Sequence, residues 1–251
     1  MITPNTKKGM GWWPDLPDFR DHKLSLEKKR VFHDTDFRSS MPPIYDQGET
    51  SGCVAHGIAA AIQHRRKVET LPDFEPSRLF IYANARIIEN ELNKDDGCEI
   101  RDGIKAVASQ GAPDEKYWPF DTKKLLVKPS DEAYKMGLTD LVSEYQSVDV
   151  NESSMLTALD AGYPVVFGIS LYDSFDSDAV AATGIVPMPS KTENVIGGHC
   201  MLAVGAKIEE KIFIVRNSWG DWGDSGYCYM PFDYMLNTDL VDDCWIIKVV
   251  K

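Results

Sequence analysis

Apolar residues recur every three or four positions in the first half of the chain, a spacing that is typical of amphipathic helices. The clearest pattern begins at Cys53 and continues to about Lys67, with alanines between the larger side chains. The same spacing predicts further helices over residues 77–92, 101–110 and 153–162. The first half is therefore expected to be mainly helical.

Short runs rich in Val, Ile and aromatic residues replace this pattern after about Leu141, and turn-forming residues separate them. They predict antiparallel strands within residues 165–172, 199–208, 211–219, 227–232 and 244–250. Helices followed by strands indicate an α+β protein with two segregated halves. We expect a helical half over residues 36–140 and a β-rich half over residues 141–251.

Residues 1–35 are expected to form a leader, because they contain several prolines and no helical or alternating apolar period. Trp12 and Trp13 are adjacent in this irregular segment. Two neighbouring tryptophans are unlikely to face water, so we expect them to pack onto the body of the protein.

Charge excludes one class of partner. The formal net charge is -12, and the only basic cluster, Arg65 to Lys67, lies at a predicted helix end, where cations complement the dipole. Nucleic acid is therefore not expected as a partner. No apolar run reaches the length of a membrane span, and the N-terminus lacks the pattern of a secretory signal. We expect a cytoplasmic protein that does not bind membranes; secretion by a route without a visible signal is the alternative.

The five cysteines are an odd number and form no CxxC pair, which disfavours a zinc ribbon and a redox motif. Cys200 follows His199 directly, so on a strand the two side chains point to opposite faces and do not chelate together. Cys228 and Cys244 lie in apolar runs and are expected in the core. No metal and no cofactor are predicted, and a mostly reduced, intracellular state fits best.

Cys53 is the candidate nucleophile. It follows a glycine-containing turn and opens a predicted helix, where the positive end of the helix dipole favours a thiolate and free N–H groups can bind an oxyanion. Gln47, on the approach to the same turn, can supply a second oxyanion hydrogen bond. Nucleophile and oxyanion donors would then come from one short segment.

His199 is the candidate base. It follows Gly197 and Gly198 and opens an apolar strand, so it can project into a cleft from a rigid support. Asn217 ends the next strand and can orient the imidazole by accepting its second N–H. His56 lies one helical turn after Cys53 and is expected to pack along that helix instead.

These segments resemble the active-site blocks of papain-like cysteine peptidases. The blocks are DQGETSGC up to Cys53, GGH at His199, and NSWGDWGDSGY from Asn217, in the family's order. The similarity covers nearly all of residues 36–251. It implies a papain-like α+β fold, in which an active-site cleft separates the helical half from an antiparallel, β-barrel-like half.

The resemblance also implies an activity and roles for single residues. Cys53 and His199 would form a thiolate–imidazolium pair that hydrolyses peptide bonds through a thioester. Gln47 would complete the oxyanion hole, Trp219 would shield the His199–Asn217 bond, and Trp222 would line the leaving-group side. Gly198, Asp102 and Gly103 are expected to contact substrate. A peptide or protein would be the substrate of a monomeric enzyme.

The chain departs from the family pattern at Thr50, which replaces a cysteine, and at Val54, which replaces an aromatic residue. The loss of the cysteine would leave Cys98 without a disulfide partner. The segment GWWPDLPDFRDH is similar to the short leader of the bacterial, xylellain-like branch. We therefore expect a bacterial zymogen whose leader lies in or near the cleft and restrains activity.

Two other functions remain open from the residues alone. A Cys–His acyltransferase of the transglutaminase type would share the nucleophile and base but would yield an amine-exchanged product. A catalytically inactive relative would use the fold for binding, and Cys53 would then react no faster than the other cysteines. Release of free acid and rapid alkylation of Cys53 would exclude both.

Overall fold

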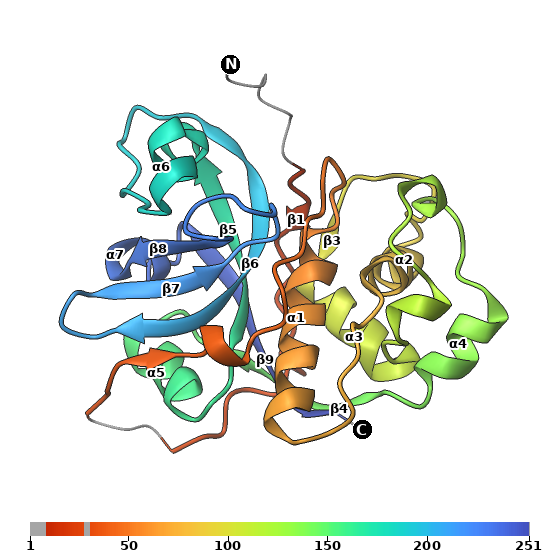
Figure 1. The fold of residues 1–251 in the computed structure, drawn as a ribbon. Helices are drawn as coiled ribbons and strands as arrows, with labels where there is room; N and C mark the ends of the chain where they lie inside the picture. Colours follow the sequence, from red (N-terminus) through yellow and green to blue (C-terminus); the bar gives the residue numbers. More distant parts are fainter. Residues whose placement is uncertain (1–8, 28–30, 251) are drawn as a thin grey trace.

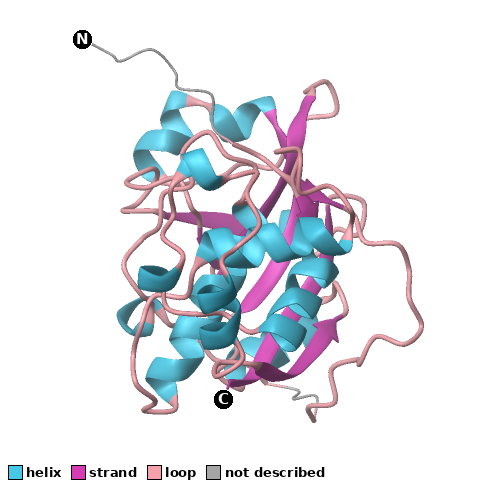
Figure 2. Cartoon of the chain, turned by 90° about the vertical axis from the view of Figure 1, so that its right-hand side faces the viewer, coloured by secondary structure: helices cyan, strands magenta, loops and turns pink. Residues whose placement is uncertain are grey.

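The computed structural model describes residues 9–27 and 31–250. A helical part and a twisted antiparallel sheet lie side by side, with the long helix α1 (Cys53–Val68) between them (Figure 1). Viewed from the side, the helices stand in front of the strands (Figure 2). This arrangement confirms the α+β, papain-like architecture that was expected from the sequence.

The helical part is built around α1, whose residues from Cys53 to Arg66 are all buried. The Ala-rich sequence permits this burial, because small side chains let neighbouring elements approach from several sides. Ser77 and Ser130 cap two of the other helices with their hydroxyl groups. The remaining helices are α2 (Arg78–Ile88), α3 (Ile100–Gln110), α4 (Asp131–Gly137), α5 (Glu152–Asp160), α6 (Asp178–Thr183) and α7 (Phe232–Met235), with 3-10 turns at Arg38–Ser40, Glu115–Tyr117, Thr122–Lys124 and Asp173–Asp176.

The main sheet contains seven strands among the described residues, and its order is β4-β9-β5-β6-β7-β8, with β2 paired to β6. All of these pairs are antiparallel. Alternating and continuous apolar runs bury one or both faces, as expected for a sheet covered by helices. The strands are β2 (Thr35–Asp36), β4 (Val142–Val148), β5 (Val165–Tyr172), β6 (Val195–Lys207), β7 (Ile212–Arg216), β8 (Tyr227–Pro231) and β9 (Val241–Val250).

The leader crosses from one half to the other. Its strand β1 (Trp12–Trp13) pairs in parallel with β3 (Cys98–Glu99) of the helical part. In Figure 1, β1 lies between β3 and the strands β5 and β6. Further along, Lys23 forms a bridge with Ser147 of β4. The first eight residues of the predicted leader and residues 28–30 lie outside the described part of the chain.

Most predicted elements are present, with shifted ends. The helix predicted over residues 77–92 ends at Ile88, and the strand predicted from His199 already begins at Val195. Strand β4 was missed because Ser143, Glu144 and Gln146 make it too polar to stand out. The prediction for the two tryptophans is half right, since Trp12 is 7% exposed and Trp13 is 57% exposed.

Candidate active site

Cys53 is the first residue of α1, and no side chain caps this helix. The first N–H groups of an uncapped helix lack partners within the helix. The backbone N–H groups of Cys53 and Val54 act on the thiol and lower its pKa, as the helix dipole would. The nucleophile candidate is thus placed where a thiolate can be stabilised.

His199 lies on β6 and is held by the end of β7. Its Nε2 is 2.8 Å from Oδ1 of Asn217, which fixes the orientation of the imidazole ring. The Trp219 ring packs against that imidazole at a centroid distance of 4.8 Å and is itself buried. The hydrogen bond is therefore shielded from water, and Nδ1, on the other side of the ring, has no hydrogen-bond partner among the residues that the structure describes.

Cys53 and the His199 segment come together across the boundary between α1 and the sheet. The backbone N–H of Cys200, the residue after His199, acts on the Cys53 thiol. Helix α1 also packs along β6. Sequence positions 146 residues apart are thus brought to one place by helix-on-sheet packing.

Both reactive groups are fully buried, and burial sets their protonation. It raises the pKa of Cys53 to about 11, although nearby N–H groups lower it in part. Burial also lowers the pKa of His199 to about 4, against the hydrogen bond to Asn217, which raises it. Burial therefore disfavours the charged form of both groups.

Gln47 lies beside this pair and is completely buried. Its Nε2 donates to the carbonyl of Thr50 at 2.7 Å and to the carbonyl of Gly9 at 3.1 Å. Its Oε1 accepts from the Ser218 hydroxyl at 2.6 Å, which fixes the orientation of the amide. The donor predicted for an oxyanion is thus occupied by a carbonyl group of the leader.

The leader contacts the candidate site at two points. The Gly9 carbonyl also accepts from Trp219 Nε1 at 3.3 Å, and the N–H of Gly11 acts on the Cys53 thiol. The Gly11 carbonyl in turn accepts from the backbone N–H of Cys98 at 2.9 Å. These contacts explain why Cys53 is inaccessible to solvent.

Glycines in the leader and in the body of the protein allow the two backbones to lie this close together. A Cβ added to Gly9 would lie 1.9 Å from the Thr50 carbonyl oxygen, and one added to Gly11 would lie 2.1 Å from the Ser51 carbonyl oxygen. On the opposite side, a Cβ at Gly97 would lie 2.0 Å from the Gly11 carbonyl oxygen. No L-side chain fits such spaces, so backbone meets backbone directly.

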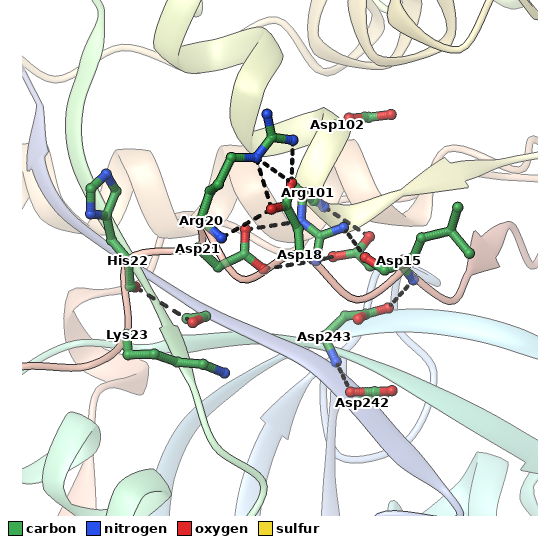
Figure 3. A network of polar contacts seen from close by, with 12 residues as sticks. Asp15, Asp18, Arg20, Asp21, His22, Lys23, Arg101, Asp102, Asp242 and Asp243 are labelled. Atoms are coloured by element: carbon green, nitrogen blue, oxygen red, sulfur yellow. Dashed lines mark hydrogen bonds and ion pairs between the residues drawn. The ribbon is translucent and has the colours of Figure 1, made fainter.

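The next part of the leader is held by Arg101 of α3. Its guanidinium pairs with Asp21 through two hydrogen bonds of 3.1 and 2.8 Å and donates to the Leu16 carbonyl. Asp15 accepts from the Arg101 backbone N–H at 3.2 Å, and its carboxylate is 3.7 Å from the guanidinium. Figure 3 shows this one arginine surrounded by leader residues.

The two residues proposed for the substrate cleft on α3 lie elsewhere. Asp102 forms an ion pair with Lys105 on its own helix and stands apart from the leader network in Figure 3. A Cβ at Gly103 would lie 2.6 Å from Ile58, so Gly103 lets α3 pack against α1. On this side of the protein the backbone of Gly97 and Cys98 contacts the leader. The glycine that the leader approaches most closely here is therefore Gly97, which precedes α3, and not Gly103 within it.

The aromatic residues after Asn217 form one buried group. Trp222 stacks on Phe175 at a centroid distance of 5.0 Å and meets Trp219 edge to face at 5.3 Å. Gly198, in contrast, lies against the leader, since a Cβ there would be 2.4 Å from the Trp12 carbonyl oxygen. The structure thus brings Gly198 to the leader and places Trp222 behind Trp219.

His56 and the other cysteines lie in the interior of the protein. His56 Nδ1 is 2.8 Å from the Gly52 carbonyl oxygen, so His56 fastens the start of α1. All five cysteines are buried and free of disulfides. Among residues 9–27 and 31–250, no group of three or more His, Cys, Asp or Glu residues is arranged to hold a metal ion.

Comparison with known proteins identifies the class. Residues 32–246 match the family described as papain family cysteine protease. The chain belongs to this family and is a thiol-dependent hydrolase of peptide bonds. The papain-like fold expected from the sequence is thereby confirmed.

Two relatives resemble the chain over its whole length. The crystal structure of xylellain, a cysteine protease from Xylella fastidiosa, is 38% identical, has a TM-score of 0.90 and covers 100% of both chains. An uncharacterised peptidase C1-like protein of Acanthamoeba polyphaga mimivirus is 36% identical over 100% of this chain and 90% of its own length. The expected likeness to the xylellain-like branch is confirmed.

More distant relatives agree with the family. Cysteine proteinase 3 of Entamoeba histolytica is 24% identical over 79% of this chain and 62% of its own length.

In the described part of the chain, no helix has both the length and the apolar character needed to span a membrane.

Proposed function

We propose that the enzyme is a latent cysteine peptidase in which Cys53, His199, Asn217 and Gln47 perform the reaction while the leader holds the cleft closed. The observation that carries this proposal is the double contact of the leader with the catalytic residues. The Gly9 carbonyl occupies the amide of Gln47, and the Gly11 N–H faces the Cys53 thiol.

The reaction begins with a proton transfer. Nδ1 of His199, which has no hydrogen-bond partner, takes the proton of the Cys53 thiol, and Asn217 keeps the imidazole ring in position. The thiolate then attacks the carbonyl carbon of a peptide bond. Gln47 Nε2 and the Cys53 N–H stabilise the negative oxygen of the tetrahedral intermediate.

Collapse of this intermediate breaks the C–N bond. His199 returns its proton to the leaving amine, and the acyl group stays on Cys53 as a thioester. A water molecule, deprotonated by His199, hydrolyses the thioester and releases the free acid and the thiol. No dissociable cofactor takes part in this scheme.

The leader is expected to keep the enzyme inactive in two ways: it obstructs access to Cys53, and it buries Cys53 and His199. Because the pKa of Cys53 is raised to about 11 and that of His199 is lowered to about 4, the covered site disfavours the thiolate–imidazolium pair. Removal of the leader would admit water and stabilise both charges. The zymogen character expected from the sequence is thus part of this proposal.

Several finer predictions accompany it. We expect a monomeric cytoplasmic enzyme of bacterial origin that acts on peptides or proteins, with a helical half over residues 36–140 and a β-rich half over residues 141–251. The His199 segment of the second half then faces Cys53 of the first across the cleft. Trp222 is expected to line the leaving-group side.

The experiment measures hydrolysis of a fluorogenic peptide by the full chain carrying Gly9→Val and Gly11→Val. We expect release of free acid, and loss of at least about 10³-fold in kcat/KM on Cys53→Ser or His199→Ala, as for other nucleophile–base pairs. Asn217→Ala should cause a smaller loss of kcat/KM, because it only frees the imidazole ring of His199 to rotate. Turnover that survives His199→Ala would contradict the assignment.

A further inference from the structure

Two polar side-chain atoms in the interior, close to the His199–Asn217 pair, have no hydrogen-bond partner among the described residues. They are Nε2 of His56 and Nδ2 of Asn217. His56 is 1% exposed and Asn217 is 2% exposed. Buried polar atoms of this kind are almost always hydrogen-bonded, either to protein or to an ordered water. Both atoms therefore require a partner.

The two residues line the same small cavity between α1 and the strands β6 and β7. Its other walls include Gly57 and Ala60 of α1 and residues 200–202 of β6, and its volume is about 10 Å³. A buried water needs roughly 10–15 Å³ of such space and two to four polar partners. The cavity therefore fits one water molecule and no larger ligand.

The orientation of the Asn217 amide is fixed by two neighbours. The backbone N–H of Ser218 can only donate, so the atom that faces it at 2.8 Å is the amide oxygen Oδ1. The same oxygen is 2.8 Å from Nε2 of His199, which therefore carries a proton and leaves Nδ1 free as a base. Nδ2 is thus the unpaired end of Asn217, and it offers only donors.

His56 presents the complementary group. Its Nδ1 is 2.8 Å from the carbonyl oxygen of Gly52, which can only accept, so Nδ1 carries a proton. Burial, followed by the positive charge of Arg78, lowers the pKa of His56 to about 3, so the ring is neutral near neutral pH. A neutral ring with its proton on Nδ1 has a lone pair on Nε2. His56 is therefore an acceptor and Asn217 is a donor.

The three other polar side chains on the cavity wall already donate elsewhere. Those of Tyr45, Arg216 and Ser218 donate, in this order, to Oε1 of Gln63, to the carbonyls of Pro42 and Pro43, and to Oε1 of Gln47. Their partners lie outside the cavity wall. A water molecule is thus the donor that the lone pair of His56 can reach.

We propose that one buried water joins His56 to Asn217, and that His56 is thereby a positioning residue for His199. The water accepts from Nδ2 of Asn217 and donates to Nε2 of His56. It holds the amide in the orientation in which Oδ1 receives the N–H of His199. The inference deepens the proposed function and rests on it, because the orientation of His199 matters only if His199 is the base.

Two variants separate the two nitrogens of His56, and both are made in the full chain that carries Gly9→Val and Gly11→Val. His56→Asn keeps an N–H near the position of Nδ1 for the Gly52 carbonyl, but it has no atom near the position of Nε2. His56→Gln has an oxygen that reaches the position of Nε2, but it loses the bond to Gly52. The two variants therefore keep opposite halves of the imidazole.

We expect His56→Asn to lower kcat for a fluorogenic peptide about three- to tenfold, as for the loss of one hydrogen bond. KM should stay unchanged, because His56 acts through Asn217 and not on the substrate. His56→Gln should restore most of kcat. A role confined to the start of α1 predicts the reverse order, since only His56→Asn keeps the bond to Gly52. That order, or equal kcat in both variants, overturns the proposal.

The dependence on Asn217 is tested by combining substitutions. In Asn217→Ala the amide is gone, so His56→Asn should lower kcat no further. An equal loss with and without the amide would show that His56 acts by another route. His64→Asn is the matched control, because His64 is also on α1 and 1% exposed but does not line the cavity. It should leave kcat unchanged.

A third measurement uses the natural chain and needs neither a variant nor turnover. In NMR spectra the side-chain amide protons of Asn217 should show a nuclear Overhauser effect to water, with the sign of a long-lived, buried molecule. Absence of this effect removes the water and overturns the proposal, whatever the peptidase activity. A parent chain without turnover would instead count against the proposed function, and the NMR spectra would still decide whether the water is present.

Discussion

The leader is held in two different ways along its length. From Gly9 to Trp13, backbone groups and glycines lie at contact distance from Gln47 and from the backbone of Thr50 and Ser51. From Asp15 to Asp21, carboxylates and a carbonyl surround the Arg101 side chain. The first region blocks the site by shape, and the second supplies charge, so the two should respond differently to sterics, to salt and to pH.

The largest effect on the alkylation rate of Cys53 is expected from substitutions at the closely packed glycines of the first region. A Cβ at Gly9 or Gly11 meets backbone carbonyls that cannot move aside, so Gly9→Val with Gly11→Val should expel the first region of the leader. We expect alkylation of Cys53 by iodoacetamide, located by peptide mapping, to accelerate by at least about 100-fold, equivalent to about 3 kcal/mol of lost docking. The four other cysteines, also buried, serve as internal references.

Leu16→Val is the control for that variant. Leu16 is 75% exposed, so a valine in its place introduces a β-branched residue into the leader without a clash. Alkylation of Cys53 should then stay at the natural rate. Equal rates in the glycine variant and in the natural chain would show that shape does not hold the first region.

A smaller effect is expected at Arg101. Arg101→Met removes a guanidinium that is 10% exposed and leaves Asp15 and Asp21 without their cation. Hydrogen bonds to charged groups contribute about 1.5–3 kcal/mol each, but part of this is regained when the freed carboxylates are hydrated. We expect alkylation of Cys53 to accelerate about 10- to 50-fold.

Arg20→Met is the matched control, because Arg20 pairs with Asp18 inside the leader and is exposed. It removes the same charge without a contact to the body. An equal acceleration in both variants would assign the effect to net charge and not to the Arg101 contacts. Added salt should weaken the Arg101 contribution more than the glycine packing.

The second region should also respond to pH. Burial, followed by repulsion from Asp243, raises the pKa of Asp15 to about 8, and burial raises that of Asp243 to about 6. Released carboxylates return toward 3.8, so the docked leader binds protons more tightly than the free leader. Docking is therefore strongest below about pH 4 and weakens as the pH rises through about 6 and then about 8.

The measurement is the ratio of alkylation rates, glycine variant to natural chain, between pH 5 and pH 9. The ratio removes the pH dependence of the thiol itself, and we expect it to fall about tenfold as the pH rises. Asp15→Asn keeps an acceptor for the Arg101 N–H but cannot ionise, so it should flatten the profile. A ratio that rises with pH would mean that the docked leader releases protons, and the raised pKa values of Asp15 and Asp243 would then not control docking.

The two regions also differ in what the sequence could predict. Cys53, His199, Asn217 and Gln47 could be predicted as one site because their chemistry depends on residue types within short segments, and the structure places Gln47, His199 and Asn217 beside the leader or the Cys53 segment. The leader contacts join positions such as Trp12 and Asp243, 231 residues apart, and no periodicity relates them. The positions of Asp102 and Gly103 could not be predicted for the same reason: a glycine that faces the leader, such as Gly97, and one that packs two helices, such as Gly103, look alike in the sequence.

Strand β4 and Asp243 show two further limits. The polar positions of β4 hide its pairing with β9, which only the assembled sheet makes favourable. In the sequence Asp243 looks like one of several acidic surface residues. In the structure, the bulge in β9 directs its side chain toward Trp12. Tertiary packing, and not local propensity, determines the pairing of β4 and the direction of the Asp243 side chain.

The smallest effect is expected at Trp13, where the two regions of the leader meet. Its indole N–H donates to the Asp96 carbonyl, but more than half of the residue is exposed. A solvent-exposed hydrogen bond contributes little, so Trp13→Ala should accelerate Cys53 alkylation by less than about threefold. Trp12→Ala, which removes the buried indole, should accelerate it by about 30-fold, equivalent to about 2 kcal/mol. This is less than the about 3–5 kcal/mol of a truncation inside a core, because water can enter the vacated space at the edge of the leader. Equal effects of the two substitutions would mean that the leader is held by its backbone alone, and that the buried indole of Trp12 does not contribute to its docking.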